Sequence, residues 1–447
     1  MPAGKFKPAN EQLALLRKGA AEIIREEELK EKLAQSFMSG KPLRVYLGVD
    51  PTAPDIHLGH IVVLRKLRHF QEMGHTAVFL IGDFSAMIGD PTGQSETRPP
   101  LTRQEVEKNA ETYLKQVFKI LDKKTTEVRY NSEWLDKLTA SDVVKLCSHY
   151  SLPRMLERED FKIRFESGKA YEQQKFNALA QLANINLEAN PLPGPNPQIL
   201  SKVRKPQSIS VHELLYPLLT AYDAVALKSD VELGATEQKF NLLVHREIQR
   251  EYGLKGQVIL TMPILVGLDG ARKMSKSLGN YVGITDPPGE MFGKIMSVTD
   301  ELMWQYYELL TDFPSPVVVR LQEEVKMGVL HPKDAKMQLA HTIVASFHGE
   351  EAAKKAGEEF QLVFRDRQAP TEIPEMRLTW GTRPLFSLLT ETGLASSRSE
   401  AERLIKQGGV EVDGHVEKDV KRTIVLNPGD LLPLRVGKKK FLRVVGI

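Results

Sequence analysis

The sequence contains a single cysteine, Cys147, among its 447 residues. One cysteine excludes an internal disulfide framework and a thiolate zinc cluster, and it favours a reducing compartment. No run approaches the roughly 18 unbroken apolar residues of a transmembrane helix. The first residues, MPAGKFKPANEQ, lack the apolar core of a secretory signal. We therefore expect a cytoplasmic protein with no membrane contact.

The sequence also has little net charge, +3 at pH 7, but the charge is unevenly distributed. Residues 376–447 hold 13 basic and 8 acidic residues, whereas the rest of the chain holds 48 and 50. A basic tail on a near-neutral body is typical of a protein whose one end binds a polyanion. A chance surface excess in a small domain is the alternative, and charge alone does not decide between the two.

Strand-like and helix-like segments alternate through the first two thirds of the chain. The apolar strand TAVFLIGDF follows RVYLGVD and an intervening helix, which is the pattern of a parallel βαβ unit. This alternation predicts an α/β fold with an open, Rossmann-like, doubly wound parallel sheet, which binds ligands at the carboxyl ends of its strands. The other expected elements are helices at 11–39, 103–121 and 140–148, the strand EVRYNS, and strands near 225–233 and 257–265.

The rest of the chain divides by composition. We expect a sheet domain over residues 1–298, helices over 299–364, a linker with two prolines over 365–383, and a compact α+β unit over 384–447. Within the first domain, residues 169–206 join a short amphipathic helix to a proline-rich coil. We interpret them as a surface insertion, with a partner contact as the alternative.

The sequence DPTAPDIHLGH places two histidines and a glycine where a strand gives way to a helix. Free N–H groups and the helix dipole favour phosphate at such a helix start. Gly59 leaves room for a purine ring, and His57 and His60 are three residues apart and share a helix face. The alternative is a pair of ordinary surface histidines.

A second polar stretch, KMSKSLGN, follows the apolar run VILTMPILVGL. Lys273 and Lys276 bracket a Met-Ser pair, and Gly279 follows. A cationic, hydroxyl-bearing loop with a glycine hinge predicts a mobile grip on a polyanion, and a solvated basic loop is the alternative.

HLGH and KMSKS, in this order on an α/β sheet, resemble the HIGH and KMSKS elements of class I aminoacyl-tRNA synthetases. RVYLGVDPTAPDIHLGH, GDFSAMIGDPTG, HELLYPLLTAYD, VELGATEQKFNLL and MPILVGLDGARKMSKSLGNYVGI are together similar to the bacterial tyrosyl-tRNA synthetases. The resemblance covers nearly the whole chain except residues 169–206. The tail, with FSLLTETGLASSRSEAERLIKQGGVEVDG, resembles an RNA-binding domain first named from a small-subunit ribosomal protein.

The resemblance implies a catalytic first domain, anticodon-region helices, an RNA-binding tail and a set of site residues. It implies that Tyr46 and Asp223 hold the substrate phenol, that Asp90 and Tyr216 hold its ammonium, and that Gln238 lies near its carboxylate. It implies that Mg²⁺ arrives with ATP, and no protein-bound metal is expected. Catalytic groups would be Thr52, His57, His60, Arg98, Lys273 and Lys276, with ATP contacts from Gly48, Asp50, His57, Gly59, His60, Gly234, Glu237, Lys273, Met274, Ser275, Lys276 and Ser277. Candidate tRNA contacts are Arg398, Arg403, Lys406, Lys438, Lys439 and Lys440.

The sequence departs from the family pattern at three positions. Thr220 stands where the family usually has Gln, in the tyrosine-binding set. Glu237 replaces an Asp, and Gln94 replaces a common basic residue. A shorter hydroxyl at position 220 reaches less far than an amide, which leaves open a bridging water, weaker tyrosine binding or a changed choice of amino acid.

The implied activity is tyrosine–tRNA ligation: tyrosine and ATP form an adenylate and pyrophosphate, and tyrosyl then passes to the 3′-terminal adenosine of its tRNA. The family also implies a homodimer. Tryptophanyl-tRNA synthetase is the nearest alternative enzyme, although Tyr46 with Asp223 suits a phenol better than an indole. A relative that binds RNA without catalysis is the alternative outside enzymes, and the intact HLGH and KMSKS argue against it.

Overall fold

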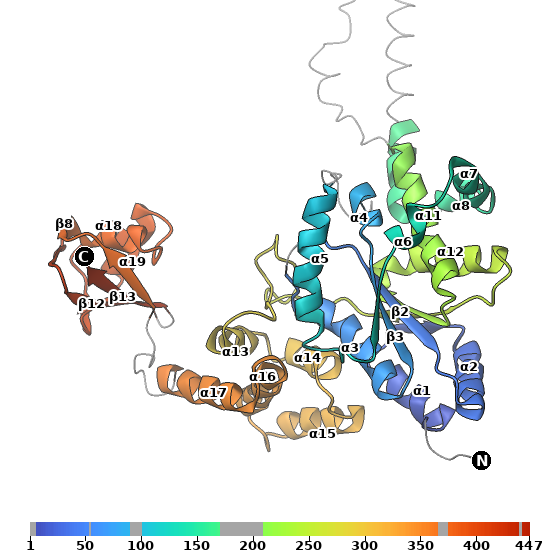
Figure 1. The fold of residues 1–447 in the computed structure, drawn as a ribbon. Helices are drawn as coiled ribbons and strands as arrows, with labels where there is room; N and C mark the ends of the chain where they lie inside the picture. Colours follow the sequence, from blue (N-terminus) through green and yellow to red (C-terminus); the bar gives the residue numbers. More distant parts are fainter. Residues whose placement is uncertain (1–5, 53–54, 90–100, 170–208, 365–373, 438–439) are drawn as a thin grey trace, which may run out of the picture. The chain divides into compact units, whose positions relative to one another are not determined.

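The computed structural model describes residues 6–52, 55–89, 101–169, 209–364, 374–437 and 440–447 (Figure 1). The chain divides into two compact units, which we describe separately. The sheet unit comprises residues 1–286 and 298–332, and the tail unit comprises residues 287–297 and 333–447. Apart from Lys169, the expected insertion lies outside the described residues. Within those residues, no helix combines the length and apolarity needed to span a membrane.

The sheet unit is built on one six-stranded sheet with the order β1-β6-β5-β2-β3-β4. All neighbours pair in parallel except β1 and β6, which are antiparallel. This confirms the doubly wound α/β class, because each parallel crossover needs a covering helix. The strands are β1 (Glu22–Ile24), β2 (Arg44–Val49), β3 (Thr76–Ile81), β4 (Thr126–Tyr130), β5 (Val231–Ala235) and β6 (Val258–Met262).

Helices pack on the sheet through apolar faces, and the strand β3 is buried from Ala77 to Ile81, as its continuous apolar run predicts. α3 follows β2 and carries nine buried residues. The helices of the sheet unit that matter below are α1 (Ala9–Arg17), α2 (Glu26–Ser39), α3 (Leu58–Glu72), α4 (Ser85–Ile88), α5 (Arg103–Val117), α6 (Ser132–Leu135), α7 (Ala140–Ser148), α8 (Leu152–Met155), α11 (Val211–Leu227), α12 (Lys239–Glu251), α14 (Leu302–Leu310) and α15 (Ser315–Lys326).

The expected single helix over 11–39 is wrong. The chain instead forms α1, the short strand β1 and α2. Gly19 and Arg25 adopt φ of 64° and 68°, left-handed values that end one helix and precede the next. The Ala21 amide donates to the Thr261 carbonyl at 2.8 Å, so the segment gains sheet bonds on β6 that outweigh its helical pattern.

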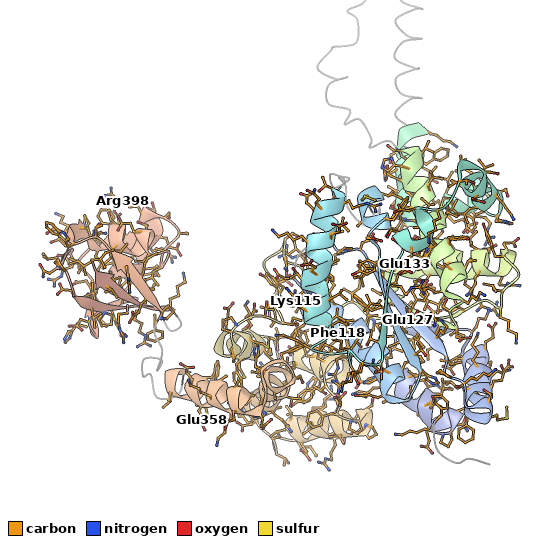
Figure 2. All side chains as sticks on the ribbon, in the orientation of Figure 1. Lys115, Phe118, Glu127, Glu133, Glu358 and Arg398 are labelled. Carbon is orange, nitrogen blue, oxygen red and sulfur yellow. The ribbon has the colours of Figure 1, made fainter. Side chains whose placement is uncertain are left out.

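β4 lies at one edge of the described sheet and is charged along its length. Arg44 contacts Glu127 at 2.9 Å, and Arg129 contacts Glu127 at 3.2 Å and Glu133 at 2.6 Å. Glu127 and Glu133 are labelled in Figure 2. Charged side chains on an edge strand disfavour pairing with another chain. β4 therefore closes one side of the sheet, whereas the carboxyl ends of the central strands β5, β2 and β3 border the cavity described below.

The tail unit contains α13 (Pro288–Met296), α16 (Pro332–His348) and α17 (Glu350–Phe364). Gly349, with φ of 85°, separates α16 from α17 in the run that looked continuously helical. The units cut across the expected helical domain at 299–364, because α14 and α15 belong to the sheet unit.

The end of the tail unit is an α+β fold with its own core. Its sheets have the orders β10-β9-β12-β13-β7 and β11-β8. β7 pairs in parallel with β13, so the last part of the expected linker at 365–383 contributes strands; residues 365–373 lie outside the described ranges. The elements are β7 (Glu375–Leu378), β8 (Gly381–Pro384), α18 (Leu385–Glu391), α19 (Arg398–Lys406), β9 (Val410–Val412), β10 (His415–Glu417), β11 (Thr423–Leu426), β12 (Leu431–Val436) and β13 (Lys440–Gly446).

Candidate active site

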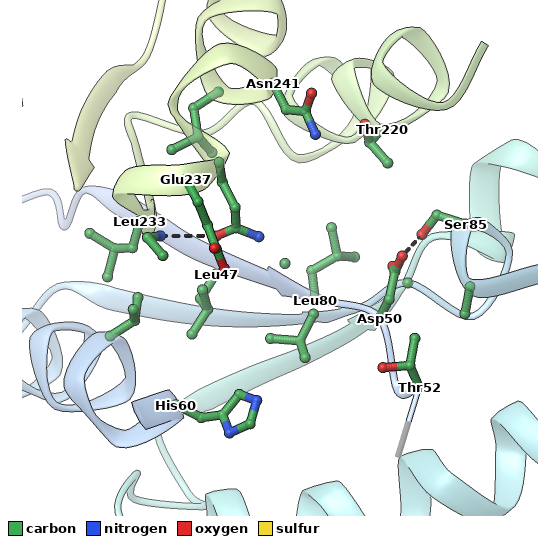
Figure 3. Close-up of a pocket in the computed structure, with 18 of the residues that line it drawn as sticks. Leu47, Asp50, Thr52, His60, Leu80, Ser85, Thr220, Leu233, Glu237 and Asn241 are labelled. Atoms are coloured by element: carbon green, nitrogen blue, oxygen red, sulfur yellow. Dashed lines mark hydrogen bonds between the residues drawn. The ribbon is translucent and has the colours of Figure 1, made fainter. Parts of the chain in front are cut away.

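A cavity of about 860 Å³ opens at the carboxyl ends of β2, β3 and β5 (Figure 3). Most of the predicted site residues line it. Gly234, Lys276 and Ser277 are described but do not line it. Asp90, Arg98 and Gln94 lie outside the described residues. The predicted residues that line the cavity are Tyr46, Gly48, Asp50, Thr52, His57, Gly59, His60, Tyr216, Thr220, Asp223, Glu237, Gln238, Lys273, Met274 and Ser275.

The Asp50 carboxylate joins three segments at the middle of the cavity. Its Oδ1 accepts from Ser85 Oγ at 2.7 Å, a bond drawn in Figure 3, and its Oδ2 accepts from Tyr216 Oη at 2.8 Å. Gly82 makes room for this arrangement, since a Cβ there would lie 2.0 Å from Asp50 Oδ1 and 2.3 Å from Ser85 Oγ. Asp50, which we predicted as an ATP contact, thus also orients a predicted tyrosine contact.

The two histidines of HLGH form the start of α3. His57 Nδ1 accepts from the Gly59 amide at 3.2 Å, and His60 Nδ1 accepts from the His57 amide at 3.3 Å. Burial lowers the pKa of His57 to about 3 and the pKa of His60 to about 4. Both rings are therefore neutral at pH 7. With Nδ1 accepting, each Nε2 carries the hydrogen and can donate to an anion.

The KMSKS loop lies against this helix start, as the shared-site prediction requires. The Leu58 amide donates to the Val282 carbonyl at 3.0 Å, and His57 forms a β-bridge with Gly283. Lys276 Nζ contacts Asp55 Oδ2 at 2.7 Å. The positive charge of Lys276 contributes to the lowered pKa of His57, after burial and the neighbouring His60.

Both lysines are ion-paired. Lys273 Nζ contacts Glu237 Oε2 at 3.1 Å, and both side chains are about half exposed, at 50% and 46%. Lys276 also lies 6.0 Å from the centroid of the Tyr281 ring. Exposed pairs of this kind contribute roughly 0–1 kcal/mol, so a more highly charged anion can replace the carboxylates.

The deep end of the cavity holds Tyr46 and Asp223. Tyr46 is 1% exposed, and its hydroxyl has no hydrogen-bond partner of good geometry among the described residues. Burial raises the pKa of this phenol well above its usual value, and the adjacent Glu232 carboxylate adds to the rise. Burial likewise raises the pKa of Asp223, whose Oδ1 accepts from Trp134 Nε1 at 2.7 Å.

The structure reveals contacts that the sequence did not indicate. Trp134 and Asn131, which follow β4, hold Asp223, with Asn131 Nδ2 3.4 Å from Asp223 Oδ2. His245 lies 3.0 Å from Thr220 Oγ1. The nearest signal was the polar NS that ends EVRYNS, because polar residues after a parallel strand face the ligand edge.

Gln238 and Gly234 shape the turn that connects β5 to α12. Gln238 Oε1 accepts from the Ala235 amide at 2.9 Å and so closes the turn η1 (Thr236–Gln238) after β5. A Cβ on Gly234 would lie 2.8 Å from a Leu242 methyl and 3.1 Å from Gln238 Oε1. Glycine at 234 therefore allows α12 to approach the strand end.

The predicted tRNA contacts lie in the tail unit. Arg403 and Lys406 are exposed on α19, while Ile405 is buried in the core, as the helix spacing predicts. Arg398 lies over the Phe386 ring at 4.4 Å and bonds Glu402 at 2.8 Å. Lys440 donates to the Leu394 carbonyl at 3.0 Å. Lys438 and Lys439 lie outside the described residues.

Family comparisons agree with this geometry. The family described as tRNA synthetases class I (W and Y) matches residues 38–180 and 196–365. The S4 domain family matches residues 383–432. These two matches cover the cavity and the end of the tail unit.

Individual proteins are similar over nearly the full length. A tyrosine–tRNA ligase of Oleidesulfovibrio alaskensis is 51% identical, covering 98% of this chain and 99% of that protein. A tyrosine–tRNA ligase of Thermotoga maritima is 48% identical, covering 98% of each. The crystal structure of tyrosyl-tRNA synthetase with L-tyrosine from Archaeoglobus fulgidus is 25% identical with a TM-score of 0.56, covering 78% of this chain and 99% of that one.

Replacing Gly82 with Ala should disrupt the Asp50 hydrogen bonds. The added methyl would displace the carboxylate from Ser85 and Tyr216, and the loss of a charged hydrogen bond in a buried site costs about 1.5–3 kcal/mol. We expect the rate of the chemistry in this cavity to fall by about 10- to 100-fold. Gly168→Ala is the matched control, because it also lies in the sheet unit and its Cβ would meet nothing within 4 Å. Equal rates for both variants would contradict the role of the Asp50 contacts.

Proposed function

Because this chain belongs to the tyrosine–tRNA ligases of class I, we propose that its cavity activates tyrosine with ATP and then transfers tyrosyl to the terminal adenosine of tRNA. In the first step the tyrosine carboxylate attacks the α-phosphorus, and pyrophosphate leaves with its Mg²⁺. The observation that carries this proposal is the meeting of the HLGH helix start and the KMSKS loop beside a cavity whose deep end holds a phenol and a carboxylate.

The deep end suits the hydroxyl of a tyrosine side chain. A phenol both donates and accepts, so it can bond to a carboxylate and to a second hydroxyl at once. Asp223 supplies an acceptor, and the buried Tyr46 hydroxyl lacks a partner of its own. Phenylalanine would leave the Tyr46 hydroxyl unpaired, at a cost of about 1–3 kcal/mol. An indole N–H needs only an acceptor, so tryptophan would leave Tyr46 unpaired.

The ammonium and carboxylate would lie toward the cavity mouth. Tyr216 Oη donates to Asp50, and a phenol oxygen that donates can also accept, so we propose that Tyr216 contacts the ammonium. Asp90 is the second ammonium acceptor that we propose, on the family resemblance alone. Gln238 borders the same region and would guide the carboxylate.

ATP would lie between the HLGH helix start and the KMSKS loop. The adenine ring would cover the bare backbone of Gly59, and the neutral His57 and His60 would donate from Nε2 to phosphate oxygens. Mg²⁺ would arrive as part of the substrate. The carboxylate nucleophile needs no general base, so catalysis rests on in-line placement and on stabilisation of the charge that develops on the departing pyrophosphate.

Exchange of labelled pyrophosphate into ATP, measured with each amino acid in turn, tests this function. We expect exchange that depends on tyrosine and much weaker exchange with phenylalanine or tryptophan, because each would leave the Tyr46 hydroxyl unpaired. Tryptophan-dependent exchange would instead favour a tryptophan enzyme. No exchange with any amino acid would favour an RNA-binding protein without catalysis.

Replacing Lys273 or Lys276 with Ala should slow adenylate formation by roughly 10²- to 10⁴-fold. Each ammonium would leave its carboxylate for the pyrophosphate oxygens only as charge develops, so tyrosine affinity should stay nearly unchanged. Stopped-flow kinetics separates binding from chemistry. Lys239→Ala is the matched control, since Lys239 is also ion-paired, with Glu22 at 2.6 Å, and does not line the cavity. Lost tyrosine binding with an intact chemical step would refute the assignment.

We further propose that the tail unit binds tRNA through its basic surface. Phosphate contacts would come from Arg398, Arg403, Lys406 and Lys440, with Lys438 and Lys439 added from the family resemblance. The helices α16 and α17 would contribute to binding the anticodon region of the tRNA.

We also propose, from the family resemblance, that the protein is a homodimer and lies in the cytoplasm.

The double variant Arg403→Ala/Lys406→Ala should weaken tRNA charging and leave pyrophosphate exchange intact. Two lost phosphate contacts should raise the KM for tRNA and reduce the slope of log affinity against log salt by about 1.4 to 1.8, depending on strandedness. Lys123→Ala/Lys124→Ala, which removes the same charge from the exposed connection between α5 and β4, is the control. If both double variants charged tRNA alike, this face of α19 would not be the contact.

A further inference from the structure

A chain of buried polar side chains runs through the wall of the cavity behind the tyrosine-binding groups. Thr220 Oγ1 lies 3.0 Å from His245 Nε2, and His245 Nδ1 lies 2.8 Å from Glu232 Oε1. Gln257 donates to the other oxygen of Glu232. The three side chains that line the cavity, Thr220, His245 and Glu232, are 7%, 7% and 3% exposed.

Each member of this chain belongs to a different element. Thr220 lies on α11, His245 on α12 and Glu232 on β5, while Gln257 directly precedes β6. Burying a histidine, a carboxylate and an amide without partners would be costly, so their mutual bonds fix the distance between the helices and the sheet. The wall is therefore held by directional contacts as well as by apolar packing.

The hydrogen-bond directions are consistent along the chain. The Glu232 carboxylate accepts from His245 Nδ1 on one side and from the Gln257 amide on the other. With His245 Nδ1 as the donor to Glu232, the other ring nitrogen, Nε2, accepts from the Thr220 hydroxyl at 3.0 Å. The Thr220 hydroxyl therefore has a partner.

Thr220 sits between the two tyrosine-binding residues of α11. It is four residues after Tyr216 and three before Asp223, so the three share one helix face. Its hydroxyl also contacts the Tyr216 backbone directly. At the other end of the chain, Glu232 lies beside the Tyr46 phenol and contributes to the raised pKa of that group.

We propose that Thr220, His245 and Glu232 form one positioning unit for tyrosine, with His245 as a specificity-determining residue. This inference rests on the tyrosine pocket proposed above. The unit positions Tyr216 and Asp223 because Thr220 lies between them on α11. His245 also donates a hydrogen bond to Glu232, so that this carboxylate does not compete with the protein for the hydroxyl of the substrate. Thr220 and His245 together fill the space that one long side chain at position 220 would occupy.

The position of His245 leaves no room for a longer side chain at position 220. With Thr220 Oγ1 already 3.0 Å from the imidazole, a glutamine there would extend into the space of His245. Removing the imidazole would free that space and leave Glu232 as a partner for the glutamine amide. The two positions should therefore be strongly non-additive.

Thr220→Val tests the hydroxyl, because valine keeps the shape and removes one hydrogen-bonding group. In tyrosine-dependent pyrophosphate exchange we expect the KM for tyrosine to rise about tenfold, with kcat and the KM for ATP changed far less. Thr220→Ser keeps the hydroxyl and should recover most of the lost affinity. Thr112→Val is the matched control, since Thr112 of α5 makes the same helical bond, to Lys108 at 3.2 Å, on an exposed face.

A second pair of variants tests the exclusion. Thr220→Gln should raise the KM for tyrosine by more than about tenfold, and Thr220→Gln/His245→Ala should recover at least about tenfold over that single variant. The thermal unfolding midpoint of each variant is recorded alongside.

The inference requires both results. If Thr220→Val shifted only the unfolding midpoint and kept the KM for tyrosine, the unit would be purely structural and the inference overturned. If the double variant recovered nothing over Thr220→Gln, it would be overturned as well. Lack of tyrosine-dependent exchange in the unaltered chain would instead overturn the proposed function, which keeps the two failures distinct.

Discussion

The carboxylate of Asp50 is the contact on which the rest of the site depends. It follows β2 at the centre of the sheet, and its two oxygens hold α4 through Ser85 and α11 through Tyr216. A hydrogen bond to a charged group is worth about 1.5–3 kcal/mol, more than a neutral one. Because α11 also carries Thr220 and Asp223, anchoring Tyr216 at Asp50 fixes how that whole helix face meets the cavity. The carboxyl ends of the strands provide the floor of the cavity, and the Asp50 carboxylate fixes the position of α11 above it.

The two ends of the cavity use electrostatics differently because they differ in burial. At the mouth, Lys273 and Lys276 rest on Glu237 and Asp55 in pairs that water screens. Such pairs keep the loop beside His57 without binding it tightly, so phosphate can take the place of the carboxylates. Neutral imidazoles suit this arrangement, because they add donors without repelling the lysines. In the function proposed above, this weak pairing would let the loop close around the phosphates and open again for release.

The sequence predicted the parts of the site that are local motifs. HLGH indicated a helix start, KMSKS a polar loop, and the apolar strands a parallel sheet, so the meeting of the two motifs could be predicted although they lie far apart in the chain. The partner of Thr220 could not. No motif in the sequence singled out His245, and only the approach of α12 to α11 brings it to Thr220. β1 was missed for a related reason: its three residues have a helical pattern, and the bonds to β6 that make it a strand come from more than 200 positions away.

At the deep end of the cavity, burial requires that each polar group has a hydrogen-bond partner. Asp223 and Glu232 are both carboxylates buried close to Tyr46, and two unpartnered charges there would repel and resist burial. Trp134 and Asn131 supply donors to the first, while His245 and Gln257 supply donors to the second. The Tyr46 hydroxyl, beside Glu232, has no hydrogen-bond partner of good geometry among the described residues. In the function proposed above, recognition at this end would come from a hydrogen bond between the substrate phenol and the Tyr46 hydroxyl, and burial would make that bond selective, because an unpaired polar group costs more in a buried site than in water.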